Sequence, residues 1–114
     1  MQERLRKFFE AENKRDWESY RQFLHPQVRW RLFGAEEKRI EGVEEYMRVM
    51  KSAYEGRDTQ FVCQKMEVSD DGRRIAAHLL NDQGERSLDI FDFKEGRIYR
   101  EYEFLMSVGT GEKG

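Results

Sequence analysis

The sequence is poor in cysteine, histidine and long apolar runs, and each shortage excludes a class of structure. Cys63 is the only cysteine in 114 residues, which excludes an intrachain disulfide and a cysteine zinc cluster. No apolar run resembles a secretion signal or approaches membrane-spanning length. We therefore expect a cytoplasmic protein that does not bind membranes. The two histidines, His25 and His78, are far apart and match no metal motif, so we expect no metal and no cofactor.

An excess of charge of one sign is also missing. The 21 Lys and Arg residues are interleaved with 23 Asp and Glu residues, and the net charge is −2. Without a basic stripe, the chain does not have the pattern of a nucleic-acid-binding protein. Charged residues make up 39% and apolar residues 38%, but the apolar set includes 8 Phe, 5 Tyr and 2 Trp. These large side chains provide enough buried area for one small domain.

The first half of the chain has helical periodicity. A first helix is predicted over residues 3–14, where the side chains at helical spacing are Leu5, Phe8, Phe9 and Glu12. Asp16 can cap a second helix, which ends at Pro26 because the residue before proline avoids helical angles. A third helix follows Gly42, with apolar residues three and four apart over residues 43–54.

The remaining segments alternate with a period of two. Residues 28–33 and 39–42 predict a strand and a short return strand, and four longer strands follow at 59–68, 73–80, 86–93 and 97–106. Helices followed by a long antiparallel meander indicate an α+β fold with the helices on one face of the sheet. We expect a single domain over residues 1–106 and a flexible tail over residues 107–114.

Strand 86–93 is apolar on both faces. Phe91 shares one face with Asp89, whereas Leu88 and Ile90 share the other. The helices can cover only one face, so we expect a homodimer in which a second copy covers the outer face. The alternative is that Leu88 and Ile90 are ordinary exposed aliphatic residues.

Three segments, in this order, resemble the nuclear transport factor 2-like superfamily in its SnoaL-like branch. They read FFEAENKRDWESYRQFLHPQVRW, RIEGVEEYMRVM and FDFKEGRIYREYEF, and the resemblance covers roughly residues 3–106. It implies a cone in which three helices pack on the concave face of a curved, mostly antiparallel sheet around an apolar pocket. The superfamily includes steroid isomerases, polyketide cyclases, dehydratases, epoxide hydrolases and members without chemistry, so the fold alone does not decide the function.

The resemblance points to two carboxylates. Asp89 stands four residues before Phe93, which matches the acid that holds the enolate oxygen in steroid isomerases, but Phe8 replaces their tyrosine. Residues 31–34 also lack their proton-transferring aspartate. Glu103 follows Ile98 by five positions, as the acid/base residue of SnoaL-type cyclases does.

Asp89 and Glu103 also lie on the strands that carry the two acids of epoxide hydrolases of this fold. The bridging arginine of those enzymes is expected at position 87, where this chain has Ser87. Tyr102 stands where the cyclases often have tryptophan before their acid.

A carboxyl group inside an apolar cone would have a raised pKa and could exchange protons near neutral pH. We therefore take Asp89, Glu103 and His78 as candidate catalytic residues. The structural alternatives are that the acids pair with arginines on neighbouring strands (Arg29, Arg31 or Arg100) and that His78 is a hydrogen-bonded core residue. The candidate pocket-lining residues are Phe8, Trp30, Met47, Met50, Phe61, Cys63, Phe91 and Tyr102.

The sequence leaves two functions open. In the first, the cone binds a small apolar or aromatic molecule and catalyses acid/base chemistry such as isomerisation, cyclisation or dehydration. In the second, the protein is a non-catalytic ligand-binding or dimerisation module whose own aromatic side chains fill the pocket.

Overall fold

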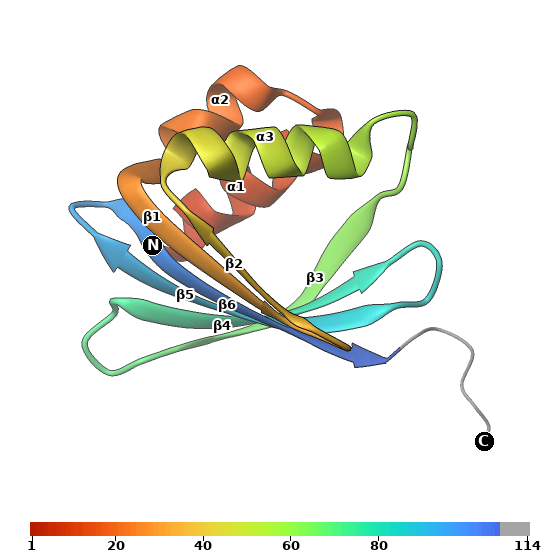
Figure 1. The fold of residues 1–114 in the computed structure, drawn as a ribbon. Coiled ribbons are helices and arrows are strands. Elements are labelled where there is room, and N and C mark those ends of the chain that lie inside the picture. Colours follow the sequence, from red (N-terminus) through yellow and green to blue (C-terminus); the bar gives the residue numbers. More distant parts are fainter. Residues whose placement is uncertain (108–114) are drawn as a thin grey trace.

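The structure is a computed structural model that describes residues 1–107. Three helices lie together above one face of a sheet (Figure 1). They are α1 (Gln2–Lys14), α2 (Trp17–Gln22) and α3 (Val43–Tyr54). None of the helices in this part of the chain is long and apolar enough to cross a membrane.

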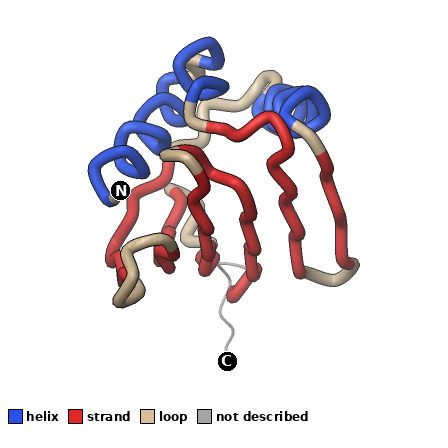
Figure 2. Tube along the Cα trace, turned by 90° about the vertical axis from the view of Figure 1, so that its left-hand side faces the viewer, coloured by secondary structure: helices blue, strands red, loops and turns tan. Residues whose placement is uncertain are grey.

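Six strands form a single curved sheet beneath the helices (Figure 2). In chain order they are β1 (Leu24–Phe33), β2 (Glu37–Glu41), β3 (Phe61–Val68), β4 (Arg74–Asn81), β5 (Arg86–Lys94) and β6 (Arg97–Ser107). Their order across the sheet is β2-β1-β6-β5-β4-β3, and every neighbouring pair is antiparallel except β1 and β6. The predicted α+β fold, with helices on the concave face of a mostly antiparallel sheet, is confirmed.

Local sequence explains where several elements begin and turn. The Asp16 carboxylate accepts a hydrogen bond from the Ser19 backbone N–H and so caps α2. Gly42 precedes α3 with a φ of 89°, which a residue with a side chain rarely adopts. The β5–β6 turn likewise uses Glu95 and Gly96 with positive φ, and it sets β5 against β6 in the register that the site depends on.

Pro26 does not end a helix, as the sequence suggested, but lies within β1. Helix α2 already ends at Gln22, and Leu24, predicted on the helix, pairs with Ile98 of β6. The β1–β6 pairing is irregular between Leu24 and Arg29, so Pro26 falls where a missing backbone N–H costs no ladder hydrogen bond.

The core lies between the helices and the inner face of the sheet and is largely aromatic. Phe8 stacks on Tyr20 with ring centroids 4.2 Å apart and meets Phe91 of β5 edge to face at 6.2 Å. Both faces of β5 are partly apolar, as predicted, because Leu88 and Ile90 are half-buried on the outer face. Strand β6 includes Ser107, and the rest of the expected tail, residues 108–114, lies outside the described residues.

Candidate functional site

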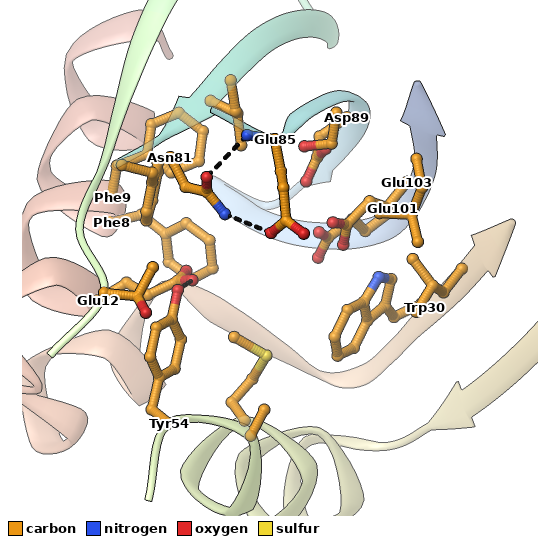
Figure 3. Close-up of a pocket in the computed structure, with 18 of the residues that line it drawn as sticks. Phe8, Phe9, Glu12, Trp30, Tyr54, Asn81, Glu85, Asp89, Glu101 and Glu103 are labelled. Atoms are coloured by element: carbon orange, nitrogen blue, oxygen red, sulfur yellow. Dashed lines mark hydrogen bonds between the residues drawn. The ribbon is translucent and has the colours of Figure 1, made fainter. Parts of the chain in front are cut away.

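A cavity of about 380 Å³ separates the helices from the inner face of the sheet. Its lining includes eight aromatic side chains, which come from all three helices and from β1, β3 and β5 (Figure 3). The Trp30 and Tyr46 rings adjoin on one side, with centroids 5.0 Å apart. A cavity of this volume has room for a small organic molecule.

Three carboxylates on β5 and β6 converge on this cavity, and we call them the acid cluster: Asp89, Glu101 and Glu103. Asp89 pairs directly with Glu103 across the two strands, and Glu101 is two residues before Glu103 on the same face. One carboxylate oxygen from each residue lies within 4.8 Å of those of the other two. Asp89 and Glu101 are each only 4% exposed.

The acid cluster is incompletely satisfied by the protein. The Tyr46 hydroxyl donates a hydrogen bond to Oε1 of Glu101. By contrast, Oδ1 of Asp89 and Nε1 of Trp30 are buried and have no hydrogen-bond partner among the described residues. A buried polar atom without a partner is costly, so these two atoms mark a place where a bound molecule would improve the site.

Burial and mutual repulsion raise all three pKa values. Burial raises the pKa of Asp89 well above its ordinary value, and the charges of Glu103 and Glu101 raise it further. Burial and the charge of Glu103 also raise the pKa of Glu101, although the Tyr46 hydroxyl opposes the change. Burial and the charge of Glu12 raise the pKa of Glu103 to about 7. Glu103 can therefore accept or release a proton near neutral pH, and Asp89 and Glu101 keep their protons to a higher pH than ordinary acids do.

A fourth acid, the half-buried Glu12 of α1, lies on the other side of the cavity (Figure 3). Tyr20 donates a hydrogen bond to its Oε1 at 2.9 Å, and Tyr54 donates one to its Oε2 at 2.5 Å. Burial raises the pKa of Glu12, and both tyrosines and the nearby Arg15 lower it. Both oxygens of Glu12 therefore have partners within the protein.

The structure brings most of the sequence-derived candidates together. Asp89 and Glu103 line the cavity, and none of the arginines considered as partners pairs with them. Arg29 and Arg31 instead contact Glu41 and Glu37. The cavity-lining candidates from the sequence are Phe8, Trp30, Met50, Phe61 and Phe91.

Four candidates lie elsewhere. His78 is on the outer face, where its Nε2 lies 3.0 Å from a carboxylate oxygen of Glu67, because Ile75, Ala77 and Leu79 supply the inner face of β4. Tyr102 is also on the outer face, opposite Ile90, as its odd offset from Glu103 requires. Met47 and Cys63 pack in or against the core without lining the cavity.

Glu101, Glu12 and Tyr46 did not emerge as site candidates from the sequence. Glu101 could have been found, because a residue two before Glu103 shares its face of the strand. Glu12 likewise stands on the apolar stripe of its helix. Nothing in the sequence indicates that the Tyr46 hydroxyl meets Glu101, because this contact joins residues 55 positions apart.

The sequence of this chain matches a known protein family. The sequence profile of the SnoaL-like domain matches residues 5–101. The chain belongs to the SnoaL-like family. No curated protein matches this SnoaL-like chain significantly.

Solved structures with the same fold differ in the functions assigned to them. A proposed ketosteroid isomerase from Kribbella flavida is 25% identical, with a TM-score of 0.76, and the match covers 97% of this chain and 81% of the other. An LEH-like epoxide hydrolase from M. tuberculosis is 12% identical, with a TM-score of 0.75, covering 91% and 80%. A protein of unknown function with a cystatin-like fold from Methylobium petroleophilum is 14% identical, with a TM-score of 0.81, covering 95% and 76%. The last two, at such low identity, show the fold alone.

Proposed function

We propose that this SnoaL-like protein binds a small, mostly apolar molecule in the cavity and moves a proton on it, as isomerases, cyclases and dehydratases do. The observation that carries the proposal is the acid cluster, which faces a cavity of about 380 Å³ with aromatic walls. Glu103 is the proton carrier, because its pKa of about 7 lets it accept or donate a proton near neutral pH. Asp89, directly opposite, is a polar contact for the ligand.

The residues favour a cyclase-like or dehydratase-like proton transfer over the steroid isomerase arrangement. Phe8 has no hydroxyl to hold an enolate oxygen, and the Tyr46 hydroxyl is engaged by Glu101. An epoxide hydrolase-like function has less support, since Ser87 occupies the position expected for a bridging arginine. His78 has no part in the proposal because it lies on the outer face.

The test is exchange of the α-protons of 2-tetralone, an aromatic ketone, in heavy water, followed by NMR. We expect the protein to accelerate exchange, and we expect Glu103→Gln to lose the acceleration by about 100-fold or more. Glu37→Gln, which removes a carboxylate from the exposed β2, is the matched control. Equal rates for Glu103→Gln and the unmodified protein would exclude Glu103 as the proton carrier.

A second candidate function is ligand binding without chemistry. Binding of 2-tetralone with no accelerated exchange would favour it over catalysis. The self-filled version of this candidate, in which aromatic side chains occupy the pocket, is disfavoured by the open volume of about 380 Å³, which Trp30 and Phe61 line without filling.

We also propose that two copies pair through the outer face of the sheet. Leu88 and Ile90 are half-buried there, and Phe33 stacks on Phe104 with ring centroids 4.8 Å apart. Ile90→Glu should produce a monomer in analytical ultracentrifugation, whereas Lys94→Glu, at the exposed end of the same strand, should leave a dimer. A monomeric unmodified protein would contradict the pairing. The cytoplasmic location expected from the sequence stays a prediction.

A further inference from the structure

We infer that the ligand of the cavity carries a protonated amine on an apolar body, and that Asp89 receives the ammonium group. The inference rests on the proposed function only in that the cavity must bind a small molecule. It adds the chemical class of that molecule, which follows from the charges, the unpartnered atoms and the walls of the cavity.

The charge of the lining is one-sided. Among the described residues that line the cavity, the carboxylates are Glu12, Glu85, Asp89, Glu101 and Glu103, and the only cation is Arg86. Arg86 is exposed, at the start of β5. Arg15, near Glu12, donates its hydrogen bonds to backbone carbonyls, including those of Arg57 and Thr59. A carboxylate or phosphate ligand would therefore meet repulsion without a compensating cation, whereas a cationic ligand would be attracted.

The unpartnered oxygen of the acid cluster, Oδ1 of Asp89, can accept a hydrogen bond from a ligand. Oδ1 of Asp89 has no hydrogen-bond partner among residues 1–107, and only 4% of the residue is exposed to solvent. An ammonium group has three donors and can bond Asp89 together with a second member of the cluster. A single hydroxyl has one donor and brings no charge to offset the neighbouring carboxylates.

The walls suit an organic cation better than a bare metal ion. Trp30 lies beside the acid cluster (Figure 3), and Tyr46, whose hydroxyl bonds Glu101, adjoins the Trp30 ring. Aromatic rings of this kind attract ammonium groups. Phe8, Phe9 and Phe91 supply an apolar wall for the rest of the molecule. The spacing of the three carboxylates would also admit a metal ion, but an ion would leave most of the cavity of about 380 Å³ empty and its aromatic walls without a partner.

Protonation of the acid cluster makes this recognition dependent on pH. An ammonium group stabilises the ionised carboxylates, so binding should release protons and become tighter as the pH rises through neutrality. The titratable and charged groups that line the cavity with Asp89 come from the three helices, the β4–β5 turn, β5 and β6, while β1, β3 and β4 contribute none among the described residues. They are Glu12 of α1, Tyr20 of α2, Tyr46 and Tyr54 of α3, Glu85 of the β4–β5 turn, Arg86 of β5, and Glu101 and Glu103 of β6.

The test compares three probes that share one skeleton: 2-aminotetralin, 2-tetralol and tetralin-2-carboxylate. Isothermal titration calorimetry at pH 6 and pH 8 measures the affinity, and buffers of different ionisation enthalpy measure proton release. We expect the amine to bind at least about tenfold more tightly than the alcohol at pH 8, with proton release, and the carboxylate to bind weakest.

Asp89→Asn should lose most of the preference for the amine while retaining the affinity for the alcohol. Asp92→Asn is the matched control, because Asp92 is on the same strand but pairs with Arg74 on the outer face, and it should keep the preference. Urea denaturation of both variants verifies that they fold.

The outcomes separate the inference from the proposed function. If the alcohol or the carboxylate binds as tightly as the amine, the ammonium inference is wrong and ligand binding stands. Displacement of the amine by micromolar Ca²⁺ or Zn²⁺ would assign the cluster to a metal and would also overturn the inference. If none of the three probes binds at either pH, both the inference and the proposed ligand binding fail.

Discussion

Two acidic regions face each other across one cavity, and they differ in how many of their carboxylate oxygens accept hydrogen bonds from the protein. On the helical side, Glu12 accepts hydrogen bonds from Tyr20 and Tyr54 at both of its oxygens. On the sheet side, Tyr46 is the only side chain among residues 1–107 that donates a hydrogen bond to the acid cluster, and Oδ1 of Asp89 has no partner within the same residues. Burial raises the pKa of the acids in both regions.

The difference indicates that burial and a raised pKa do not by themselves identify a functional acid. Glu12 joins α1 to α2 and α3 through its two tyrosines, so we interpret it as a structural acceptor. The acid cluster concentrates three like charges without enough donors, an arrangement that costs stability and is typical of functional sites. Three experiments on stability can test this distinction.

The largest effect expected is a fall in stability as the pH rises. The pKa of Glu103 is raised from its ordinary 4.5 to about 7. The folded protein therefore binds more protons than the unfolded chain between these values, and its stability is lost as the pH rises through the folded pKa. The free energy of unfolding should fall by about 2 to 3 kcal/mol between pH 5 and pH 8 from this residue alone. Urea denaturation across this range measures it.

Glu103→Gln should flatten this pH profile, because glutamine does not titrate. Surface acids do not produce the same trend: Glu37, whose pKa is lowered by Arg31 and Arg39, loses its contribution only as the pH falls below the ordinary range. A free energy of unfolding that rises from pH 5 to pH 8 would mean that the acid cluster is not buried as described.

A smaller change in the free energy of unfolding is expected when the acid on the helical side is replaced. Glu12→Leu removes the acceptor of two tyrosine hydroxyls, Tyr20 and Tyr54, so the protein should lose about 2 kcal/mol of stability at pH 5. The loss should be smaller at pH 8, because the raised pKa of Glu12 makes its ionisation costly in the folded protein and leucine does not ionise. Glu10→Leu, on the exposed side of the same helix, should change stability by less than about 0.5 kcal/mol. If Glu12→Leu stabilised the protein at pH 8, Glu12 would behave like the acids of the cluster, and the proposed difference between the two regions would be wrong.

The sequence predicted the elements better than it predicted the site. Period-two alternation placed Asp89 and Glu103 on strands whose inner faces line the cavity, and both acids are there. The face of His78 was harder to read, because β4 is apolar on both sides and only the packing shows that Ile75 and Ala77 point inward.

Contacts between distant segments explain the rest. Tyr46 meets Glu101 only because α3 packs on β1, the strand beside β6, and no local pattern encodes that contact. Leu24 belongs to a strand because β6, more than 70 residues later, supplies its pairing partner Ile98. Tertiary context of this kind overrides local propensity at the ends of short helices.

The smallest change in stability is expected for a substitution of Asp89, and it tests most directly whether the acid cluster differs from Glu12. Asp89→Asn keeps the shape of the side chain and removes one charge from the crowded acid cluster, where the charges of Glu103 and Glu101 raise the pKa of Asp89. The raised pKa means that ionising Asp89 costs the folded protein stability, and asparagine does not ionise, so at pH 8 the variant should be more stable than the unmodified protein by about 1 kcal/mol. The difference should be smaller at pH 5, below the pKa of about 7 of the neighbouring Glu103. Loss of stability at both pH values would instead make Asp89 a structural acid like Glu12, since its replacement would then break internal hydrogen bonds without relieving any repulsion.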